Sequence, residues 1–231
     1  MFRVDIENAI IDARGLVEES YPESTGFGSD DFINAFADLK GRDVTIILNS
    51  PGGVVSEGLS IFNQIEAHNG SVTVVIDAVA ASIASVIAMA AETVIMRRKS
   101  QLFIHDPWTV AMGNAAGFRT VADHLDGLAR EIADVYAERA NSRGKESTMN
   151  DWLDLMQAET WFTAEQAVEA GIADRIASPA ARESMEDDGE TAAVTDDLTA
   201  IQPVAKLMTT KILAEVLDKR HRLMRERLGI R

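Results

Sequence analysis

The chain has 231 residues, a formal net charge of −15 and no cysteine. This length allows one sizeable core and a small appendage, and the absence of cysteine excludes disulfides, thiolate metal sites and cysteine nucleophiles. The acidic balance disfavours nucleic acid and anionic membranes as partners. Because neither a signal-peptide pattern nor an apolar run of membrane-spanning length occurs, we expect a cytoplasmic protein with no membrane partner.

The first predicted elements are a strand over 2–11 and a loop over 15–28. A helix is expected over 29–39, with a polar start that suits a cap. Val44–Leu48 is an apolar, β-branched run without alternation, which favours a strand covered on both faces. The turn Pro51-Gly52-Gly53 ends that strand.

Helices and strands continue to alternate after this turn. We expect a helix over 56–67, a strand over 72–76, a helix over 82–91, and short strands over 93–96 and 102–104. An alternation of this kind predicts an α/β fold with parallel strands.

The second half of the chain is mainly helical. The apolar stripe over 116–141 predicts a helix that is long for a single domain and therefore projects. A short helix is expected over 149–156. Thr163-Ala-Glu-Gln166 has the spacing of a capping box and begins a last helix that Gly171 ends, before a short strand over 172–176.

The composition changes at Ser178-Pro179, which suggests three parts. Residues 1–178 form the predicted main domain, 179–198 an acidic flexible linker, and 199–231 a basic helical tail. The tail either caps a neighbouring subunit or docks on another protein.

A glycine pair is the first of three features that carry chemistry. Gly52 and Gly53 follow the strand over 44–48, and the missing Cβ atoms let a substrate approach the backbone closely. Backbone N–H groups at such a position stabilise an oxyanion, and one such donor typically contributes about 10²–10³ in rate. Taken alone, the pair is typical of a simple turn.

A serine in an alanine-rich run is the second feature. Ser82 lies where the helix over 82–91 begins, so its hydroxyl and the N–H of Ile83 could form a nucleophile and a second oxyanion donor. The alternative is a helix cap. Ser85 is the rival nucleophile, but one turn further on it is expected to be buried within the helix.

A histidine at the end of an apolar strand is the third feature, because a serine needs a base to take its proton. His105 ends a buried strand, whereas His68, His124 and His221 occupy a helix end, a wet helix face and the basic tail. Asp106 is an unsuitable partner for His105, since successive residues of an extended segment point to opposite sides.

The acid that would orient this histidine is open at this stage. Asp151, Asp154 and Glu159 are candidates, and spacing alone does not choose among them. No metal site is expected, because paired histidines at ligand spacing are absent. Gly26-Phe-Gly28 lacks the rest of a phosphate-loop pattern, so no cofactor is expected either.

Together these residues resemble the ClpP-like serine peptidases, the Clp protease proteolytic subunit family that also includes phage head maturation proteases. The similarity covers roughly 3–177. Four ordered motifs carry it: Asn49–Gly53, Ala80–Ser82, Phe103–Pro107 and Glu159–Asp174.

The resemblance implies a ClpP/crotonase-like spiral of βαβ units with a projecting handle helix, assembled into stacked homo-oligomeric rings. It implies Ser82 as nucleophile, His105 as base and Glu159 as the acid, where the family usually has Asp. Oxyanion and substrate contacts would come from Gly52, Gly53 and Ile83. No cofactor or metal is implied.

The resemblance also implies a role. We expect an ATP-independent serine endopeptidase that processes scaffold or capsid proteins during phage head maturation, in the bacterial or phage-infected cytoplasm. The alternatives are a bacterial ClpP paralogue that works with a Clp ATPase, and an inactive ring-forming structural protein. The first predicted strand begins almost at Met1, where housekeeping members carry a longer arm that meets the ATPase, so the ATPase is the less expected partner.

Overall fold

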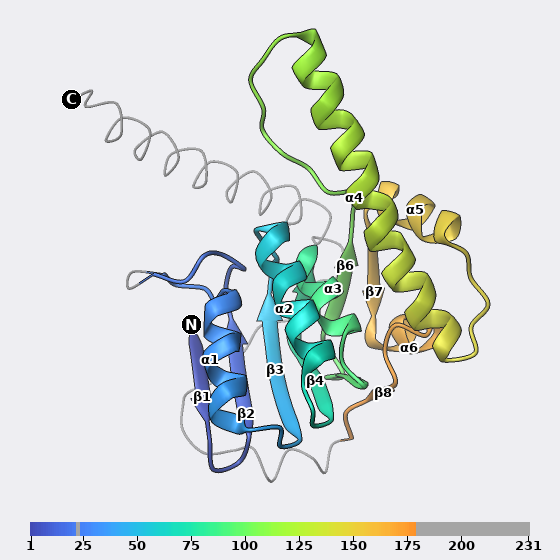
Figure 1. Ribbon diagram of the computed structural model, residues 1–231. Coiled ribbons are helices and arrows are strands. Elements are labelled where there is room, and N and C mark those ends of the chain that lie inside the picture. Colours follow the sequence, from blue (N-terminus) through green and yellow to red (C-terminus); the bar gives the residue numbers. More distant parts are fainter. Residues whose placement is uncertain (22–23, 179–231) are drawn as a thin grey trace, which may run out of the picture. The chain divides into compact units, whose positions relative to one another are not determined.

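A computed structural model describes residues 1–21 and 24–178 of the chain (Figure 1). The predicted linker over 179–198 and tail over 199–231 lie outside the described residues. Within the described part, no helix is both long enough and apolar enough to cross a bilayer.

Strands and helices alternate as the sequence predicts, so the expected α/β fold is confirmed. The strands are β1 (Phe2–Asp5), β2 (Ile10–Arg14), β3 (Val44–Ser50), β4 (Val72–Ala81), β5 (Thr93–Met96), β6 (Gln101–Ile104), β7 (Thr160–Thr163) and β8 (Arg175–Ile176). The helices are α1 (Ser29–Leu39), α2 (Val55–Ala67), α3 (Ile83–Met89), α4 (Ala115–Ser142), α5 (Met149–Gln157) and α6 (Ala164–Ala170).

One mostly parallel sheet organises these elements, in the order β1-β2-β3-β4-β5-β8. The ten residues of β4 pair with β3 on one side and with two different strands on the other. The first part of β4 pairs with β5, and its last part, Val79–Ala81, pairs with β6. β6 then pairs with β7 in antiparallel fashion. The sheet therefore forks along β4, and β6 and β7 leave its main path.

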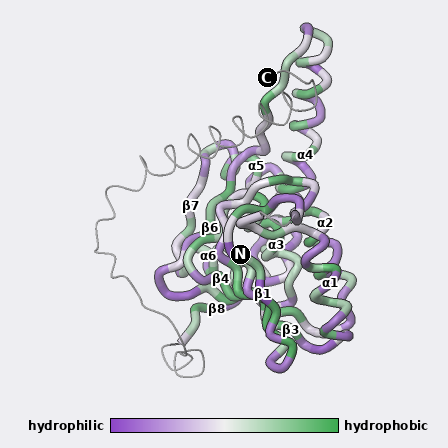
Figure 2. The backbone as a smooth tube through the Cα atoms, turned by 90° about the vertical axis from the view of Figure 1, so that its left-hand side faces the viewer, coloured by the Kyte–Doolittle hydropathy of each residue, from purple (hydrophilic) through white to green (hydrophobic). Residues whose placement is uncertain are grey.

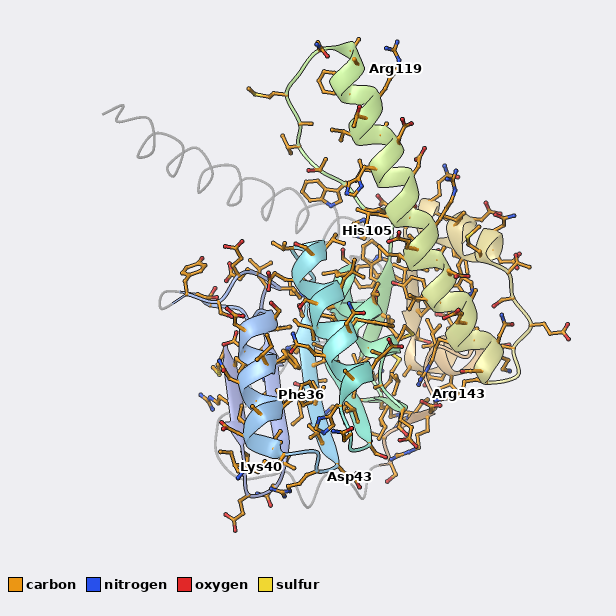
Figure 3. The ribbon with its side chains drawn as sticks, viewed as in Figure 1. Phe36, Lys40, Asp43, His105, Arg119 and Arg143 are labelled. Atoms are coloured by element: carbon orange, nitrogen blue, oxygen red, sulfur yellow. The ribbon has the colours of Figure 1, made fainter. Side chains whose placement is uncertain are left out.

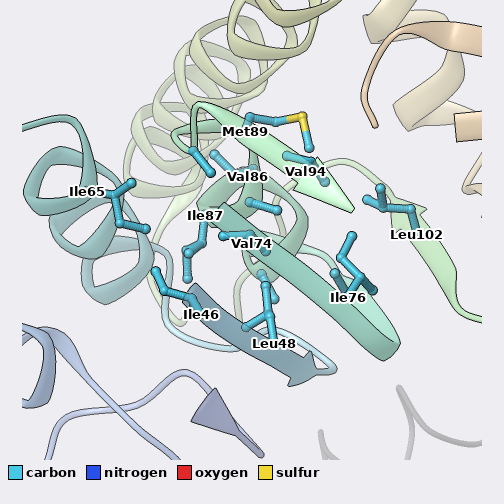
Figure 4. Packing of buried hydrophobic residues seen from close by; sticks show 14 of the residues in the cluster. Ile46, Leu48, Ile65, Val74, Ile76, Val86, Ile87, Met89, Val94 and Leu102 are labelled. Atoms are coloured by element: carbon cyan, nitrogen blue, oxygen red, sulfur yellow. The ribbon is translucent and has the colours of Figure 1, made fainter. Parts of the chain in front are cut away.

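The central part of the core lies between the sheet and helices α2 and α3. Ile46, Leu48, Val74 and Ile76 are fully buried, and Figure 4 shows them packed beside side chains of both helices. Burying one such side chain contributes about 1.5–3 kcal/mol. Figure 2 shows the hydrophobic stretches along β3 and β4.

The opposite face of these two strands is less covered. Along β3 the residues alternate between buried and half-buried, because successive side chains of a strand point to opposite faces. The apolar run had predicted cover on both faces, but the described chain fully covers only the helix side.

The single strand predicted over 2–11 is in fact a hairpin, so that prediction is wrong. β1 and β2 pair antiparallel, with Phe2 opposite Ala13. The Asp5 carboxylate accepts from the backbone and side chain of Asn8, and Ala9 has a φ of 55°. A tight turn stabilised by such local side-chain bonds has no apolar signature in the sequence.

Helix α4 is the predicted long helix, and its N-terminal half projects from the body (Figure 1). Its base is held by Arg139, which is 7% exposed. This guanidinium donates to the carbonyl of Ala91 and to the Asp174 carboxylate, each at 2.5 Å. Asp174 also accepts from the backbone N–H of Val94 at 2.6 Å and pairs with Arg143, which Figure 3 labels. These bonds join α4, β5 and the segment between α6 and β8.

Candidate active site

Three neighbouring parallel strands end at one edge of the sheet, and each is followed by a residue singled out above. Gly52 follows β3, Ser82 follows β4 and His105 follows β6. Ser50 lies opposite Ala80, and Ala81 lies opposite Phe103. Because the carboxyl ends of parallel strands meet at one edge, the register brings the three features together, at the usual position of a ligand in an α/β sheet.

Ser82 alone connects β4 to α3. Its backbone has φ 55° and ψ −132°, a strained conformation for a residue with a Cβ that costs about 1–3 kcal/mol. The N–H of Ser82 donates to the carbonyl of Phe103 at 2.9 Å. This sharp strand-to-helix turn keeps Ser82 half-buried, and a small recess contains both Ser82 and His105.

Ser85 is fully buried, as the sequence predicts. Its hydroxyl donates to the carbonyl of Ser82 at 2.5 Å and lies 2.7 Å from the Tyr136 hydroxyl. Burial raises the pKa of Tyr136, and the Ser85 hydrogen bond opposes that shift. Ser85 therefore ties the first turn of α3 to α4 and does not face the recess.

The glycine turn approaches two other segments. Gly52 has a φ of 91°, and a Cβ there would lie 2.7 Å from the Ser82 Cβ. The Gly52 carbonyl accepts from Val17 at 2.9 Å, and the Val17 carbonyl accepts from Val54 at 2.8 Å. The contribution of Val17 was not predicted, because its loop carries no motif that points to this turn.

Two backbone donors remain available at this edge. The N–H of Gly52 donates to the Ser50 hydroxyl at 3.1 Å, and that of Ser82 donates to Phe103. Within the described residues, the N–H groups of Gly53 and Ile83 have no hydrogen-bond acceptor. Of the three residues nominated from the sequence, Gly52 thus has its N–H engaged with Ser50, whereas the N–H groups of Gly53 and Ile83 are free within the described part of the chain.

His105 follows β6 directly, where the chain leaves for the loop before α4 (Figure 3). Its imidazole is stacked on the ring of Phe103, with centroids 5.2 Å apart and planes 14° apart. Burial lowers the pKa of His105, and the charges of Glu159 and Asp106 act in the opposite direction. The recess that it shares with Ser82 is otherwise mainly apolar, lined by Val55, Ile83, Val86, Pro107, Ile132 and Tyr136.

Glu159 reaches the site through β7, a strand that the sequence analysis did not predict. β7 pairs antiparallel with β6, and Thr160 lies opposite Ile104. One further step in this register brings Glu159 opposite His105. Glu159 is exposed and has a φ of 52°.

The other two candidate acids have different surroundings. The Asp151 carboxylate accepts from the N–H and the hydroxyl of Thr148, both at 2.7 Å, and so caps α5. Asp154 is exposed on the same helix. Neither carboxylate contributes to the pKa of His105, whereas Glu159 does.

The side chains are near one another but not joined. Across the described ranges, no hydrogen bond links Ser82 to His105 or His105 to Glu159. Catalytic hydrogen bonds are often long without substrate and tighten when it binds. The arrangement therefore resembles an unclosed Ser-His-acid site.

The remaining histidines lie elsewhere. His68 stacks on Phe36 with centroids 4.5 Å apart, and its Nε2 is 2.7 Å from the carbonyl of Arg42. His124 is exposed on α4, as predicted. His221 lies outside the described residues.

The fold and this edge of the sheet define an α/β protein with a serine, a histidine and free backbone donors at adjacent strand ends. The family model described as Clp protease matches residues 32–180. The chain therefore belongs to the Clp protease family, and the resemblance drawn from the four motifs is confirmed.

Curated relatives agree with this family. The chain is 30% identical over 140 residues to an ATP-dependent Clp protease proteolytic subunit of Bacteroides fragilis, which covers 59% of this chain and 64% of the relative. It is 29% identical over 143 residues to proteolytic subunit 2 of Rhodococcus jostii, covering 61% and 71%. It is 26% identical over 181 residues to proteolytic subunit 1 of Protochlamydia amoebophila, covering 74% and 84%. The chain thus spans less than two thirds of the length of the Bacteroides relative.

Proposed function

We propose that this protein is a serine endopeptidase with Ser82 as nucleophile, His105 as general base and Glu159 as the orienting acid. The observation that carries the proposal is the meeting of three strand ends, which brings a strained serine, a half-buried histidine and a glycine turn to one edge. Names of Clp protease proteolytic subunits among the relatives support it.

The geometry supports an acyl-enzyme reaction. The Ser82 Oγ attacks the peptide carbonyl carbon while His105 takes its proton, and the carbonyl oxygen becomes an oxyanion. The N–H groups of Gly53 and Ile83 stabilise that charge. His105 then donates the proton to the leaving amine, and water completes the second half by the same route. Glu159 stabilises the imidazolium that forms between these steps.

Two serine variants test this chemistry. Ser82→Ala is expected to abolish cleavage of an unstructured peptide and labelling by a fluorophosphonate probe, because it removes the only hydroxyl proposed to attack. Ser85→Ala is the matched control and is expected to retain both. Labelling that persists in Ser82→Ala, or that is lost only in Ser85→Ala, contradicts the assignment. If the wild-type protein is folded but is not labelled by the probe, the result would instead support the alternative of an inactive structural protein.

Two biological settings fit this chemistry. We propose ATP-independent processing of scaffold or capsid proteins in phage head maturation. The second candidate, a ClpP paralogue that works with a Clp ATPase, is favoured by the names of the relatives. Degradation of a folded substrate only when an unfoldase and ATP are added would select the second setting. Cleavage of capsid or scaffold protein without nucleotide would select the first.

Self-assembly is part of the proposal. Large apolar side chains are exposed on the loop before α4 and on its first turns: Trp108 44%, Val110 44%, Met112 93% and Phe118 51%. A group of this kind marks an interaction site, and the half-buried face of β3 and β4 is a second, since parallel sheets are usually covered on both faces. We expect a homo-oligomeric ring, and Met112→Asp with Phe118→Asp should lower the mass measured by light scattering.

A further inference from the structure

Three aromatic rings form a continuous stack beside the candidate base. Trp161 is stacked on Phe103 with centroids 4.4 Å apart and planes 26° apart. Phe103 is in turn stacked on His105 at 5.2 Å and 14°. All three side chains are half-buried. The imidazole therefore rests on one end of a stack whose other end is an indole.

The sheet explains why the rings meet. Phe103 and Trp161 lie directly opposite each other on β6 and β7, and side chains of an opposed pair on one face are in contact distance. His105 comes two residues after Phe103, so it lies on the same side of the chain. The stack thus follows from the same register that brings Glu159 opposite His105.

Phe103 also contacts the nucleophile. Its backbone carbonyl accepts the N–H of Ser82 at 2.9 Å, while its ring supports the His105 imidazole. A shift of Phe103 would consequently change the serine and the histidine together. Trp161 is the ring that lies against Phe103 from the neighbouring strand.

We propose that Trp161 is a positioning residue that acts through Phe103 to hold the plane of the His105 imidazole toward Ser82. This inference rests on the proposed function, because the ring plane matters only if His105 is the base. A parallel aromatic face restricts rotation of the imidazole about its ring bond, and general-base catalysis requires a proton acceptor at a defined position.

The main variants remove or keep the ring at position 161. In Trp161→Leu we expect kcat to fall about 10- to 100-fold with little change in KM, since small misplacements of catalytic groups have effects of that order. Trp161→Phe keeps an aromatic face and is expected to restore most of kcat. Phe103→Met, which removes the middle ring, provides a second variant with the same expected direction if Trp161→Leu folds poorly.

Phe162 offers a matched control on the same strand. It is 8% exposed and belongs to another ring group, with its centroid 6.2 Å from that of Trp152. Phe162→Leu is expected to lower the unfolding temperature and to leave the pH dependence of kcat unchanged. If Trp161 has a purely structural role, Trp161→Leu and Phe162→Leu should both lower the unfolding temperature and both leave the pH dependence of kcat unchanged.

The deciding measurement is an NMR titration of the His105 ring in the Ser82→Ala background, which needs no turnover. Trp161→Leu should raise the titration midpoint toward that of an ordinary histidine, because an imidazole that the stack no longer holds leaves its half-buried position and burial is what lowers its pKa. Trp161→Phe and Phe162→Leu should leave the midpoint unchanged. An unchanged midpoint together with an unchanged kcat in Trp161→Leu would overturn the inference. The titration decides this point even if Ser82→Ala still cleaves peptide, a result that would overturn the proposed function instead.

Discussion

A methyl group at Gly52 is a stringent probe of the glycine turn. In Gly52→Ala the new Cβ would lie 2.7 Å from the Ala81 carbonyl oxygen, 2.7 Å from the Ser82 Cβ and 3.3 Å from the Ile83 nitrogen. All three neighbours are backbone atoms or atoms fixed to the backbone, so none can move aside by a rotamer change. The turn and the start of α3 must therefore separate.

The expected magnitude follows from two contributions. A φ of 91° at position 52 costs an alanine about 1–2 kcal/mol, and relief of the close contacts costs about 1–3 kcal/mol more. A loss of about 2–5 kcal/mol corresponds to a fall of about 4–20 °C in unfolding temperature at this chain length. Moving Ser82 to an ordinary contact distance shifts it by about 1 Å, which is expected to lower kcat about 100-fold.

Thermal unfolding by circular dichroism and peptide cleavage kinetics test both numbers. Gly127→Ala is the control, because a Cβ at this position of α4 meets nothing within 4 Å. The free energy of unfolding of that variant should rise by about 0.5–1 kcal/mol, the usual advantage of alanine over glycine in a helix, and its kcat should not change. A Gly52→Ala enzyme with wild-type kcat would show that Gly52 and Ser82 do not approach each other as described.

Three further variants test other parts of the site. The wild-type kcat/KM should rise with pH as His105 loses its proton, and the midpoint should lie below that of an ordinary histidine because burial lowers the pKa of His105. In Glu159→Gln the midpoint should move to still lower pH, because the Glu159 charge raises that pKa. Ser85→Ala should keep kcat in the peptide assay, while urea unfolding shows a loss of about 1–3 kcal/mol, because the Tyr136 hydroxyl stays buried without its Ser85 partner. In the same assay, Asp174→Ala should lower the free energy of unfolding by about 3–5 kcal/mol, because the Arg139 guanidinium remains buried without its carboxylate partner. A higher pH midpoint of kcat/KM in Glu159→Gln would contradict the first assignment. An unchanged free energy of unfolding in Ser85→Ala or in Asp174→Ala would contradict the corresponding one.

Local patterns could be predicted from the sequence, because each depends on a few consecutive residues. The Thr163 hydroxyl accepts a hydrogen bond from the Gln166 N–H, and the Gln166 side-chain oxygen accepts one from the Thr163 N–H. These two bonds form the predicted capping box. Gly171 ends that helix with a φ of 80°. The order of strand ends at Gly52, Ser82 and His105 likewise follows from the α/β alternation.

Pairings between distant segments could not be predicted in this way. The contact of Val17 with the glycine turn joins positions about 35 residues apart along the chain. The Phe103–Trp161 stack depends on the pairing of β6 with β7, across the whole of α4 and α5. Neither pairing leaves a periodic signal in its own segment, so Val17 and Trp161 were not predicted beside the candidate site. Ser82 and His105 were predicted, and they line one recess.

The surroundings of the three candidate carboxylates show why sequence spacing could not choose the acid. Asp151 has the residue type usual for the family, but its carboxylate is engaged in capping α5. Glu159 has a left-handed φ of 52°, a conformation uncommon for residues other than glycine, asparagine and aspartate. That conformation turns the chain from the end of α5 directly into β7, so the register delivers the carboxylate opposite His105. The proposal of Glu159 as the acid therefore rests on a strand pairing and one strained residue, and the extra methylene of glutamate would supply reach from its exposed position.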